Sequence, residues 1–175
     1  MDDVIRSERL ELPLLSLSQL DRLAAGDGDS LSAELGAVLP PAWLAEIAWL
    51  ALVRAEQLRL RPADEPWLLR PILLRGDDGA RTAIGYLNFH GAPDAEGRAE
   101  IGYTLLPDAR GKGYAIEAVR AAFEWAIEVH GIRRFRAAVA PDNERSRNLI
   151  LKLGFRQTGE QWDEVDGLEL VYELG

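Results

Sequence analysis

A glycine-rich loop at residues 105–119 contains the residues whose types and spacing point most directly to chemistry. The sequence of this stretch, LLPDARGKGYAIEAV, runs from an apolar strand end into an amphipathic helix. Gly111 and Gly113 leave the loop without side chains, so several backbone N–H groups can close on one anion at the positive end of the helix. The stretch is therefore predicted to bind a phosphate group.

Two other kinds of phosphate-binding loop fit this stretch less well. A Walker loop ends in Gly-Lys followed by Ser or Thr, whereas Lys112 is followed by Gly113. A dinucleotide-binding loop needs a third small residue where Ile116 stands, although Asp142 beyond the next strand is compatible with a ribose-binding acid. The first alternative is excluded, and the second is weakened.

The composition limits the other chemistry that is available. The chain has 175 residues, the size of one ordinary domain, so we expect a single domain over residues 1–175. It contains no cysteine and two histidines, His90 and His130, and we therefore expect no metal site. No apolar run approaches a membrane span, and Met1-Asp2-Asp3 lacks the features of a signal peptide. We expect a cytoplasmic protein that does not bind a membrane.

The charge is distributed unevenly along the chain. The net charge is −9, yet residues 108–156 hold ten basic and six acidic residues, a local charge of +4 that leaves −13 elsewhere. The acidic total argues against a nucleic-acid-binding protein. A basic part and an acidic remainder suit an anionic cofactor and a cationic amine substrate, although an ordinary acidic cytosolic protein explains the total equally well.

The elements before the loop alternate between strands and helices. Alternating apolar residues predict a short strand at 8–12, and helical spacing predicts a first helix that begins near Ser16 or Ser18. Two further helices are predicted between residues 30 and 61, separated at Pro40-Pro41. Three strands then form an antiparallel meander, predicted at 67–75, 82–90 and 98–106.

The elements after the loop are predicted to complete the sheet. A helix over 113–130 leads to a strand at 135–140, which should lie parallel to the strand before the loop by the strand-helix-strand rule. Asp142 or Asn143 can cap a further helix. Strands at 155–162 and 168–174 are predicted to form a terminal hairpin.

These residues resemble the GNAT superfamily of acyl-CoA-dependent N-acetyltransferases. Its diphosphate motif is Gln or Arg, two residues, Gly, one residue, and Gly or Ala, and residues 110–115 satisfy it. The other stretches at the spacing of that superfamily are Glu100-Ile101-Gly102-Tyr103, Pro141-Asp142-Asn143, Ser146 and Lys152-Leu153-Gly154-Phe155. Residues 7–12 resemble the opening of the subgroup that includes the ribosomal-protein N-terminal acetyltransferases.

The resemblance implies an α/β (α+β) fold. We expect a mixed, mostly antiparallel central sheet of about six to seven strands, with a parallel splayed pair and helices on both faces. The resemblance is firm over residues 98–174 and loose over 5–25, while residues 26–66 carry none of these motifs.

The resemblance also implies where acetyl-CoA would bind, without a metal ion. The pyrophosphate would be held by N–H groups of the loop, and the pantetheine arm would lie along the end of the preceding strand. The residues expected to bind the cofactor are Leu105, Leu106, Arg110, Gly111, Lys112, Gly113, Tyr114, Ala115, Asn143 and Arg147. Asn143 is equally suited to capping a helix. Arg145, Arg147 and Lys152 are candidates for contact with the 3′-phosphate, although a solvated basic surface is the better explanation for any one of them.

Attack by an amine on a thioester requires a base, and the leaving thiolate requires a proton or other stabilisation. Glu100 is the leading candidate for the base, although a solvated strand carboxylate explains it equally well. His90 could line the acceptor pocket or serve as the base in place of Glu100. The alternative interpretation is that His90 is an ordinary surface residue. The Tyr that protonates the thiolate in many relatives is Ile150 here, and the resemblance therefore moves this role to Ser146, one helical turn earlier. An ordinary serine near the start of a helix explains Ser146 equally well.

We therefore expect an N-acetyltransferase that joins acetyl-CoA and a primary amine in a ternary complex. The acceptor would be a small-molecule amine or a peptide N-terminus, and a larger acyl donor and a homodimer are also compatible with the sequence. The rival hypothesis is a non-catalytic acyl-CoA-binding module, motivated by Ile150. Residues 26–66 and 91–97 are expected to shape the acceptor pocket.

Overall fold

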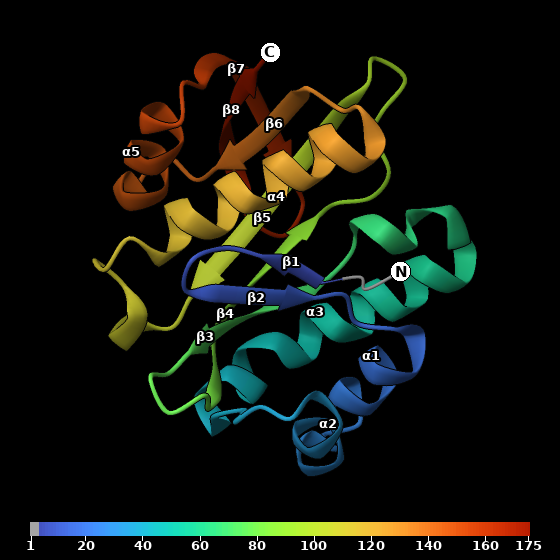
Figure 1. Cartoon of the computed structure of the whole chain (residues 1–175). Coiled ribbons are helices and arrows are strands. Elements are labelled where there is room, and N and C mark those ends of the chain that lie inside the picture. The colour runs from blue at the N-terminus through green and yellow to red at the C-terminus, as the bar shows by residue number, and fades with distance from the viewer. Residues whose placement is uncertain (1–3) are drawn as a thin grey trace.

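One eight-stranded sheet runs through the molecule, with helices on both of its faces, in a computed structural model of the chain (Figure 1). The structure describes residues 4–175; the expectation about a signal peptide rests on Met1-Asp2-Asp3, which lies outside them. The strands are β1 (Val4–Arg6), β2 (Leu10–Pro13), β3 (Arg70–Arg75), β4 (Arg81–Phe89), β5 (Arg98–Leu105), β6 (Arg134–Val139), β7 (Arg156–Asp163) and β8 (Gly167–Leu174). The helices are α1 (Leu17–Ala24), α2 (Gly28–Leu35), α3 (Pro41–Leu60), α4 (Tyr114–His130) and α5 (Glu144–Lys152), with short 3₁₀ helices at Pro62–Trp67 and Pro107–Ala109.

The predicted mixed sheet is confirmed. Its strand order is β1-β2-β3-β4-β5-β6-β8-β7, in which β5 and β6 are the parallel pair and the other neighbours are antiparallel. The described residues contain eight strands, one more than the upper end of the prediction, because β1 spans only three residues and is too short for a visible alternation. The strand expected from residue 67 begins at Arg70, since Pro62–Trp67 form a 3₁₀ helix.

The parallel pair separates soon after it forms. β5 and β6 are paired over three residues, from Arg98 beside Arg134 to Glu100 beside Arg136. Beyond this point β5 follows β4 and β6 follows β8. The sheet therefore opens a gap between the second half of β5 and the second half of β6, as the resemblance implied.

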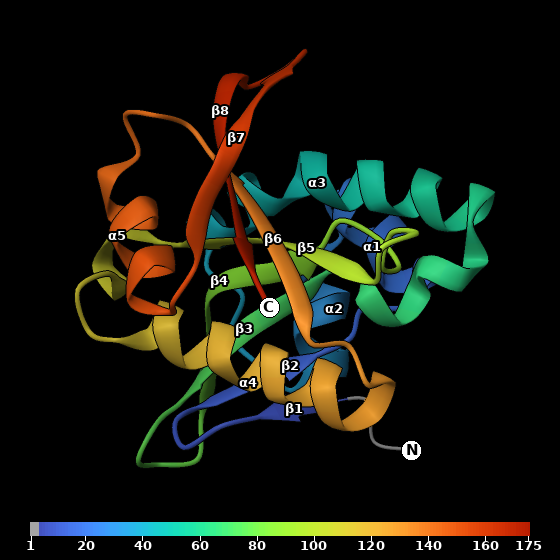
Figure 2. The same cartoon turned by 90° about the horizontal axis from the view of Figure 1, so that it is seen from above.

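Two hydrophobic cores lie on the two faces of the sheet. The helices α1, α2 and α3 cover one face, and the core beneath them includes Leu20, Leu31, Trp43 and Ile47. The helices α4 and α5 cover the other face, whose core includes Phe123, Phe135, Ile150 and Phe155. Figure 2 shows α3 and α4 on opposite sides of the strands. The gap between β5 and β6 thus joins two differently covered faces.

The sequence favours Trp43, Trp49 and Trp162 as packing residues, because large aromatic side chains are usually buried, and the structure bears this out only in part. Trp43 is fully buried, and its indole N–H donates to the carbonyl of Gly85 at 2.7 Å, as expected for a core residue. Trp49 is 62% exposed and Trp162 is 76% exposed, so the expectation that both pack inside is wrong. The helix α3 carries apolar residues on all sides, so their spacing did not reveal which face is buried. Among residues 4–175, no helix has both the length and the apolar composition to cross a membrane.

Candidate functional site

A cleft of about 520 Å³ lies where β5 leaves β6, between the first turns of α4 and α5. Its walls come from the end of β5, the glycine loop and one face of α5. The predicted site residues that it brings together are Leu105, Arg110, Gly111, Gly113, Tyr114, Ala115, Asn143 and Ser146. The predicted residues outside its lining are Leu106, Lys112, Arg147, Glu100 and His90.

The glycine loop has the backbone geometry of an anion-binding turn. Gly111 has φ 74° and Gly113 has φ 83°, both in the left-handed region that favours glycine. A Cβ added at Gly111 would meet no atom within 4 Å, so backbone conformation rather than crowding requires glycine there. The helix α4 begins at Tyr114 without a side-chain cap. Its first N–H groups are therefore available to a ligand at the positive end of the helix.

The backbone of β5 presents alternate residues to the gap. The N–H of Leu106 donates to the carbonyl of Ile84 in β4 at 2.8 Å, and its carbonyl accepts from Ala109 at 3.0 Å. Because residues of an antiparallel strand alternate in direction, Tyr103 and Leu105 turn their backbone groups toward the gap instead. This arrangement is compatible with Leu105 as a cofactor contact, whereas both backbone groups of Leu106 already have partners within the protein.

Two basic residues of the loop bond to nearby carbonyls. The Nε of Arg110 donates to the carbonyl of Leu105 at 2.9 Å, which ties the loop to the end of β5. The ammonium of Lys112 donates to the carbonyl of Asp108 at 2.8 Å on the exposed side of the loop. Arg110 therefore shapes the cleft wall, and Lys112 lies outside it.

Of the three candidate cations on α5, Arg147 lies outside the cleft lining and the other two lie in it. Arg147 donates to the carbonyl of Pro141 at 2.9 Å and to the hydroxyl of Tyr172 at 3.2 Å, and it does not line the cleft. Arg145 and Lys152 line the cleft instead. Helical spacing alone did not separate these three side chains.

Two hydroxyl groups meet inside the cleft. The hydroxyl oxygen of Tyr103 on β5 lies 3.0 Å from Oγ of Ser146 on α5. Asn143 caps α5 by accepting the N–H of Ser146 at 3.2 Å, as predicted for a helix cap. Burial raises the pKa of Tyr103, an effect that the hydrogen bond with Ser146 partly offsets. Ile150 is 1% exposed and packs in the core.

Tyr103 is not among the site residues expected from the sequence, which favours Glu100 on the same strand as the base. Residue alternation along the strand was the available signal, since it places Tyr103 on the face opposite Glu100.

Glu100 and His90 lie together on the α3 face of β5. The Nδ1 of His90 is 3.4 Å from Oε1 of Glu100, and the Nε of Arg136 is 3.7 Å from Oε2. A Cβ on Gly102 would lie 2.9 Å from Nε2 of His90 and 3.3 Å from Nδ2 of Asn88, so these side chains fold across the glycine. Neither residue is part of the lining of the cleft.

The environment keeps Glu100 ionised. Burial raises the pKa of this carboxyl, but the hydrogen bond and charge of His90 and the charges of Arg136 and Arg54 lower it further, so the net pKa lies below its ordinary value. Arg54 reaches this group from α3, and its Nε donates to Oδ1 of Asn88 at 2.8 Å. Glu100 is therefore a permanent negative charge at neutral pH.

A buried pair of polar residues holds the end of β4. The amide of Gln57 donates to the carbonyl of His90 at 2.9 Å and to the carboxylate of Asp64 at 2.6 Å. That carboxylate also accepts the N–H of Ala92 at 3.0 Å. These contacts fix the backbone that carries His90, and nothing in the sequence pattern indicated them.

The loop between β1 and β2 is fastened to the first turn of α4. Glu117 accepts from the hydroxyl of Ser7 at 2.7 Å and from the Nε of Arg9 at 2.7 Å, and its side chain is only 17% exposed. A second guanidinium nitrogen of Arg9 donates to the carbonyl of Lys112 at 3.2 Å, and the group lies 4.5 Å from the centre of the Tyr114 ring. Arg9 therefore links Glu117 to the glycine loop.

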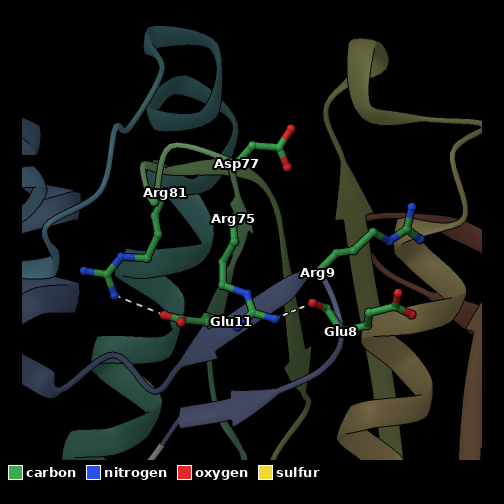
Figure 3. A pocket seen from close by; sticks show the side chains of 8 residues that line it. Glu8, Arg9, Glu11, Arg75, Asp77 and Arg81 are labelled. Atoms are coloured by element: carbon green, nitrogen blue, oxygen red, sulfur yellow. Dashed lines mark hydrogen bonds and ion pairs between the residues drawn. The ribbon is translucent and has the colours of Figure 1, made fainter.

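A second hollow of about 560 Å³ lies on the surface beside β2 and the turn between β3 and β4. Figure 3 shows Arg75 directed toward Glu8 and Arg81 directed toward Glu11. Arg75 bonds to the carbonyl of Ser7 at 2.8 Å, and Arg81 bonds to the carboxylate of Glu11 at 3.0 Å. These arginines are engaged within the protein, and the predicted site residues lie elsewhere. Among residues 4–175, no three His, Cys, Asp or Glu side chains are grouped to hold a metal ion.

Residues 9–156 match the family described as an acetyltransferase (GNAT) domain. The chain is 37% identical over 76 residues to the uncharacterized N-acetyltransferase YoaA of Bacillus subtilis (strain 168), in an alignment that covers 43% of each protein. It is 32% identical over 94 residues to the ribosomal protein uS5-alanine N-acetyltransferase of Escherichia coli (strain K12), covering 52% of this chain and 48% of that protein. The alignments thus span about half the length of these curated relatives.

Solved structures share the fold over nearly the whole chain. The ribosomal-protein-S5-alanine acetyltransferase from Vibrio fischeri has a TM-score of 0.63 at 18% identity and covers 97% of this chain and 94% of its own. The microcin C7 self immunity acetyltransferase MccE, solved in complex with acetyl-CoA and AMP, has a TM-score of 0.62 at 19% identity and covers 95% and 92%. At these identities the likeness concerns the fold.

Proposed function

The chain belongs to the GNAT acetyltransferase family, and from this premise we propose that it transfers an acetyl group from acetyl-CoA to a primary amine by direct attack in a ternary complex. The observation that carries the proposal is the cleft at the parting of β5 and β6, which ends at the uncapped first turn of α4. A pyrophosphate at one end of that cleft and a thioester in the gap account for its shape and its polar groups.

The residues of the cleft fit coenzyme A. The N–H groups that follow Gly113 suit the pyrophosphate, and the backbone N–H of Leu105 suits an amide-bearing arm lying in the gap. Arg145 and Lys152 line the same cleft and suit an additional phosphate. The thioester carried by this cofactor supplies the activated acetyl group.

The acceptor amine would approach from the α3 face. Glu100 and His90 lie there, and the lowered pKa of Glu100 keeps a carboxylate ready to attract an ammonium group. Before attack the ammonium must lose a proton, and Glu100 would take it directly or through a water molecule. Backbone N–H groups that face the gap, such as that of Leu105, would stabilise the oxyanion.

Among primary amines we favour the N-terminus of a peptide or protein. Relatives that carry names of this kind, the enzyme acting on uS5 alanine among them, support this choice. A small-molecule amine is the alternative acceptor within the same reaction. The described structure leaves exposed apolar side chains on the α3 side, Trp49 and Leu52, which suit contact with a peptide.

The test is the release of free thiol from acetyl-CoA in the presence of a panel of peptides with different N-terminal residues and a panel of small amines. We expect turnover with at least one acceptor, and a rise in melting temperature with acetyl-CoA alone. Gly113→Glu should abolish that rise, because a carboxylate would stand against the pyrophosphate and the left-handed φ would be strained.

The control variant is Gly79→Glu, which changes a glycine of similar φ, 81°, in the turn between β3 and β4, away from the cleft. In this variant acetyl-CoA should still raise the melting temperature. If acetyl-CoA also raised the melting temperature of Gly113→Glu, the assignment of the loop to the pyrophosphate would be wrong. A shift without turnover across both panels would favour an acyl-CoA-binding module over an enzyme.

A further inference from the structure

The leaving sulfur of the proposed reaction needs a proton donor. Ile150, at the position of the tyrosine that serves many relatives, is a buried aliphatic residue and cannot donate a proton. The cleft is lined by four side chains with hydroxyl groups, Tyr103, Thr104, Tyr114 and Ser146. Tyr114 stands at the loop end, with its ring beneath the guanidinium of Arg9. Thr104 is on the same strand face as Glu100, where its side chain bonds to Tyr86. Tyr103 and Ser146 are left as the candidates in the middle of the cleft.

The pair joins the two walls of the cleft. Tyr103 belongs to β5, whose backbone at this residue faces the gap, and Ser146 belongs to the first turn of α5. Their oxygens are 3.0 Å apart, and the cap formed by Asn143 fixes the position of Ser146. Both hydroxyls therefore belong to the lining of the cleft in which the proposed ligand arm would lie.

The phenol is the stronger acid of the two hydroxyls. A tyrosine loses its proton near pH 10 and a thiol near about 8.5, whereas an aliphatic alcohol holds its proton more firmly. Burial raises the pKa of Tyr103, so its proton is present throughout the physiological range. Ser146 both accepts and donates hydrogen bonds, and it can hold the phenol while the proton is transferred.

We propose that Tyr103, hydrogen-bonded to Ser146, supplies the proton that the leaving sulfur takes up, an inference that rests on the proposed acetyl transfer. The amine nitrogen bonds to the acyl carbon, and the carbon–sulfur bond breaks with its electron pair on sulfur. The Tyr103 proton moves to that sulfur. The nitrogen loses a proton as the amide forms, and water carries that proton to the phenolate. The enzyme thereby returns to its initial state.

The first test is Tyr103→Phe, which keeps the ring and removes the hydroxyl. We expect kcat to fall about 10- to 100-fold, at the low end of general acid catalysis because a thiolate leaves readily. The KM for the amine and the melting shift with acetyl-CoA should change by less than twofold. Ser146→Ala should lower kcat similarly. If the pair acts as one unit, the kcat of the double variant should be no lower than that of the slower single variant.

The matched control is Tyr172→Phe, which removes a phenolic hydroxyl bonded to Arg147 at 3.2 Å and lying outside the cleft. Its kcat should stay within twofold of the wild-type value. A Tyr103→Phe enzyme as active as the wild type would overturn the assignment. So would a lower rate in a variant whose melting temperature no longer rises with acetyl-CoA, if weaker cofactor binding accounts for the whole loss. Failure of the proposed function has a different signature, namely an inactive wild type.

A second measurement requires binding only. Coenzyme A bound to the protein is titrated by thiolate absorbance, with the acetyl-CoA complex of the same variant as the blank. A donor beside the sulfur stabilises the thiolate, so Tyr103→Phe should raise the pKa of the bound thiol by about one unit. Equal values in the wild type and in the variant would overturn the proposal regardless of the acceptor.

Discussion

Glu100 and Tyr103 lie three residues apart on β5 but on opposite faces of that strand. Glu100 lies with His90, Arg136 and Arg54 on the α3 face, and Tyr103 meets Ser146 on the other face. Their environments shift the two pKa values in opposite directions: the pKa of Glu100 is lowered and that of Tyr103 is raised. The carboxylate is therefore charged and the phenol protonated at neutral pH, the states that a base and an acid require before the reaction.

Glu100→Gln should lower kcat/KM for the amine about 100-fold, because the variant keeps the shape of the side chain and loses its charge and basicity. The acetyl-CoA melting shift should be unchanged. The control is Glu124→Gln, at an exposed position on α4. Wild-type turnover in Glu100→Gln would remove Glu100 from the mechanism.

The pH profile supplies an independent check on Glu100. Its pKa lies below the ordinary carboxyl value of 4.5, so this group stays ionised from pH 6 to pH 9. The wild-type rate should therefore rise through that range with the deprotonation of the amine and follow the pKa of whichever acceptor is used. Initial rates with two amines of different pKa test this expectation. An acid limb that is independent of the acceptor would point to another group as the base.

At the scale of the elements, the contact between the β1–β2 loop and α4 positions the glycine loop. Glu117 bonds to Ser7 and Arg9, and Arg9 bonds to the carbonyl of Lys112. Burial raises the pKa of Glu117, but these hydrogen bonds and the charge of Arg9 lower it to a net value below the ordinary 4.5. The folded state therefore binds this proton less tightly than the unfolded state does. The resulting stabilisation is present above pH 4.5 and is lost as the pH falls through the lowered pKa.

Glu117→Gln should reduce the free energy of unfolding at pH 7 by about 1 kcal/mol, a modest value because Arg9 is 42% exposed. The affinity for acetyl-CoA should also fall, since the loop loses its link to Arg9. Urea unfolding at pH 7 and at pH 3 provides the measurement, and the difference between variant and wild type should shrink at the lower pH. Glu128→Gln, exposed on the same helix, is the control. An equal difference at both pH values would contradict the assignment.

The local elements were predictable because their signals are local. Two glycines beside a helix start, the Asn143 cap and the strand-helix-strand order each depend on a few neighbouring residues, and the structure contains all three features. Most of the residues that the sequence led us to expect at the cofactor site do line one cleft. The strand of three residues, Val4–Arg6, was too short to be recognised, and the 3₁₀ helix at Pro62–Trp67 was not predicted.

Contacts between distant segments were not predictable in the same way. Helical spacing puts Glu117 on the polar stripe of α4, which would ordinarily face solvent, yet Ser7, 110 positions away in the chain, bonds to it. The bond between Tyr103 and Ser146 crosses a gap that exists only once β5 and β6 have parted. Helical spacing likewise did not distinguish Arg147, which is bonded inside the protein, from Arg145, which lines the cleft.

At the scale of the molecule, the parted strands place the two proposed substrates on opposite faces of one sheet. The cleft proposed for acetyl-CoA lies on the α4 and α5 side, and Glu100 with His90 lies on the α3 side. In the proposed reaction each substrate would therefore have its own approach, and neither would have to leave before the other could bind. The chain also contains no cysteine that could carry the acetyl group between them.

This arrangement predicts sequential kinetics. Initial rates measured at several fixed acetyl-CoA concentrations against varied amine should give intersecting double-reciprocal lines, because both substrates are bound when the acetyl group moves. Mass spectrometry of the protein mixed with acetyl-CoA alone should show no stoichiometric acetylated species on the time scale of turnover. Parallel lines, together with an acetylated protein that passes its acetyl group to added amine, would mean that a side chain carries the group. In that case the two faces would act one after the other, and the gap between β5 and β6 would serve as a passage rather than as the place of attack.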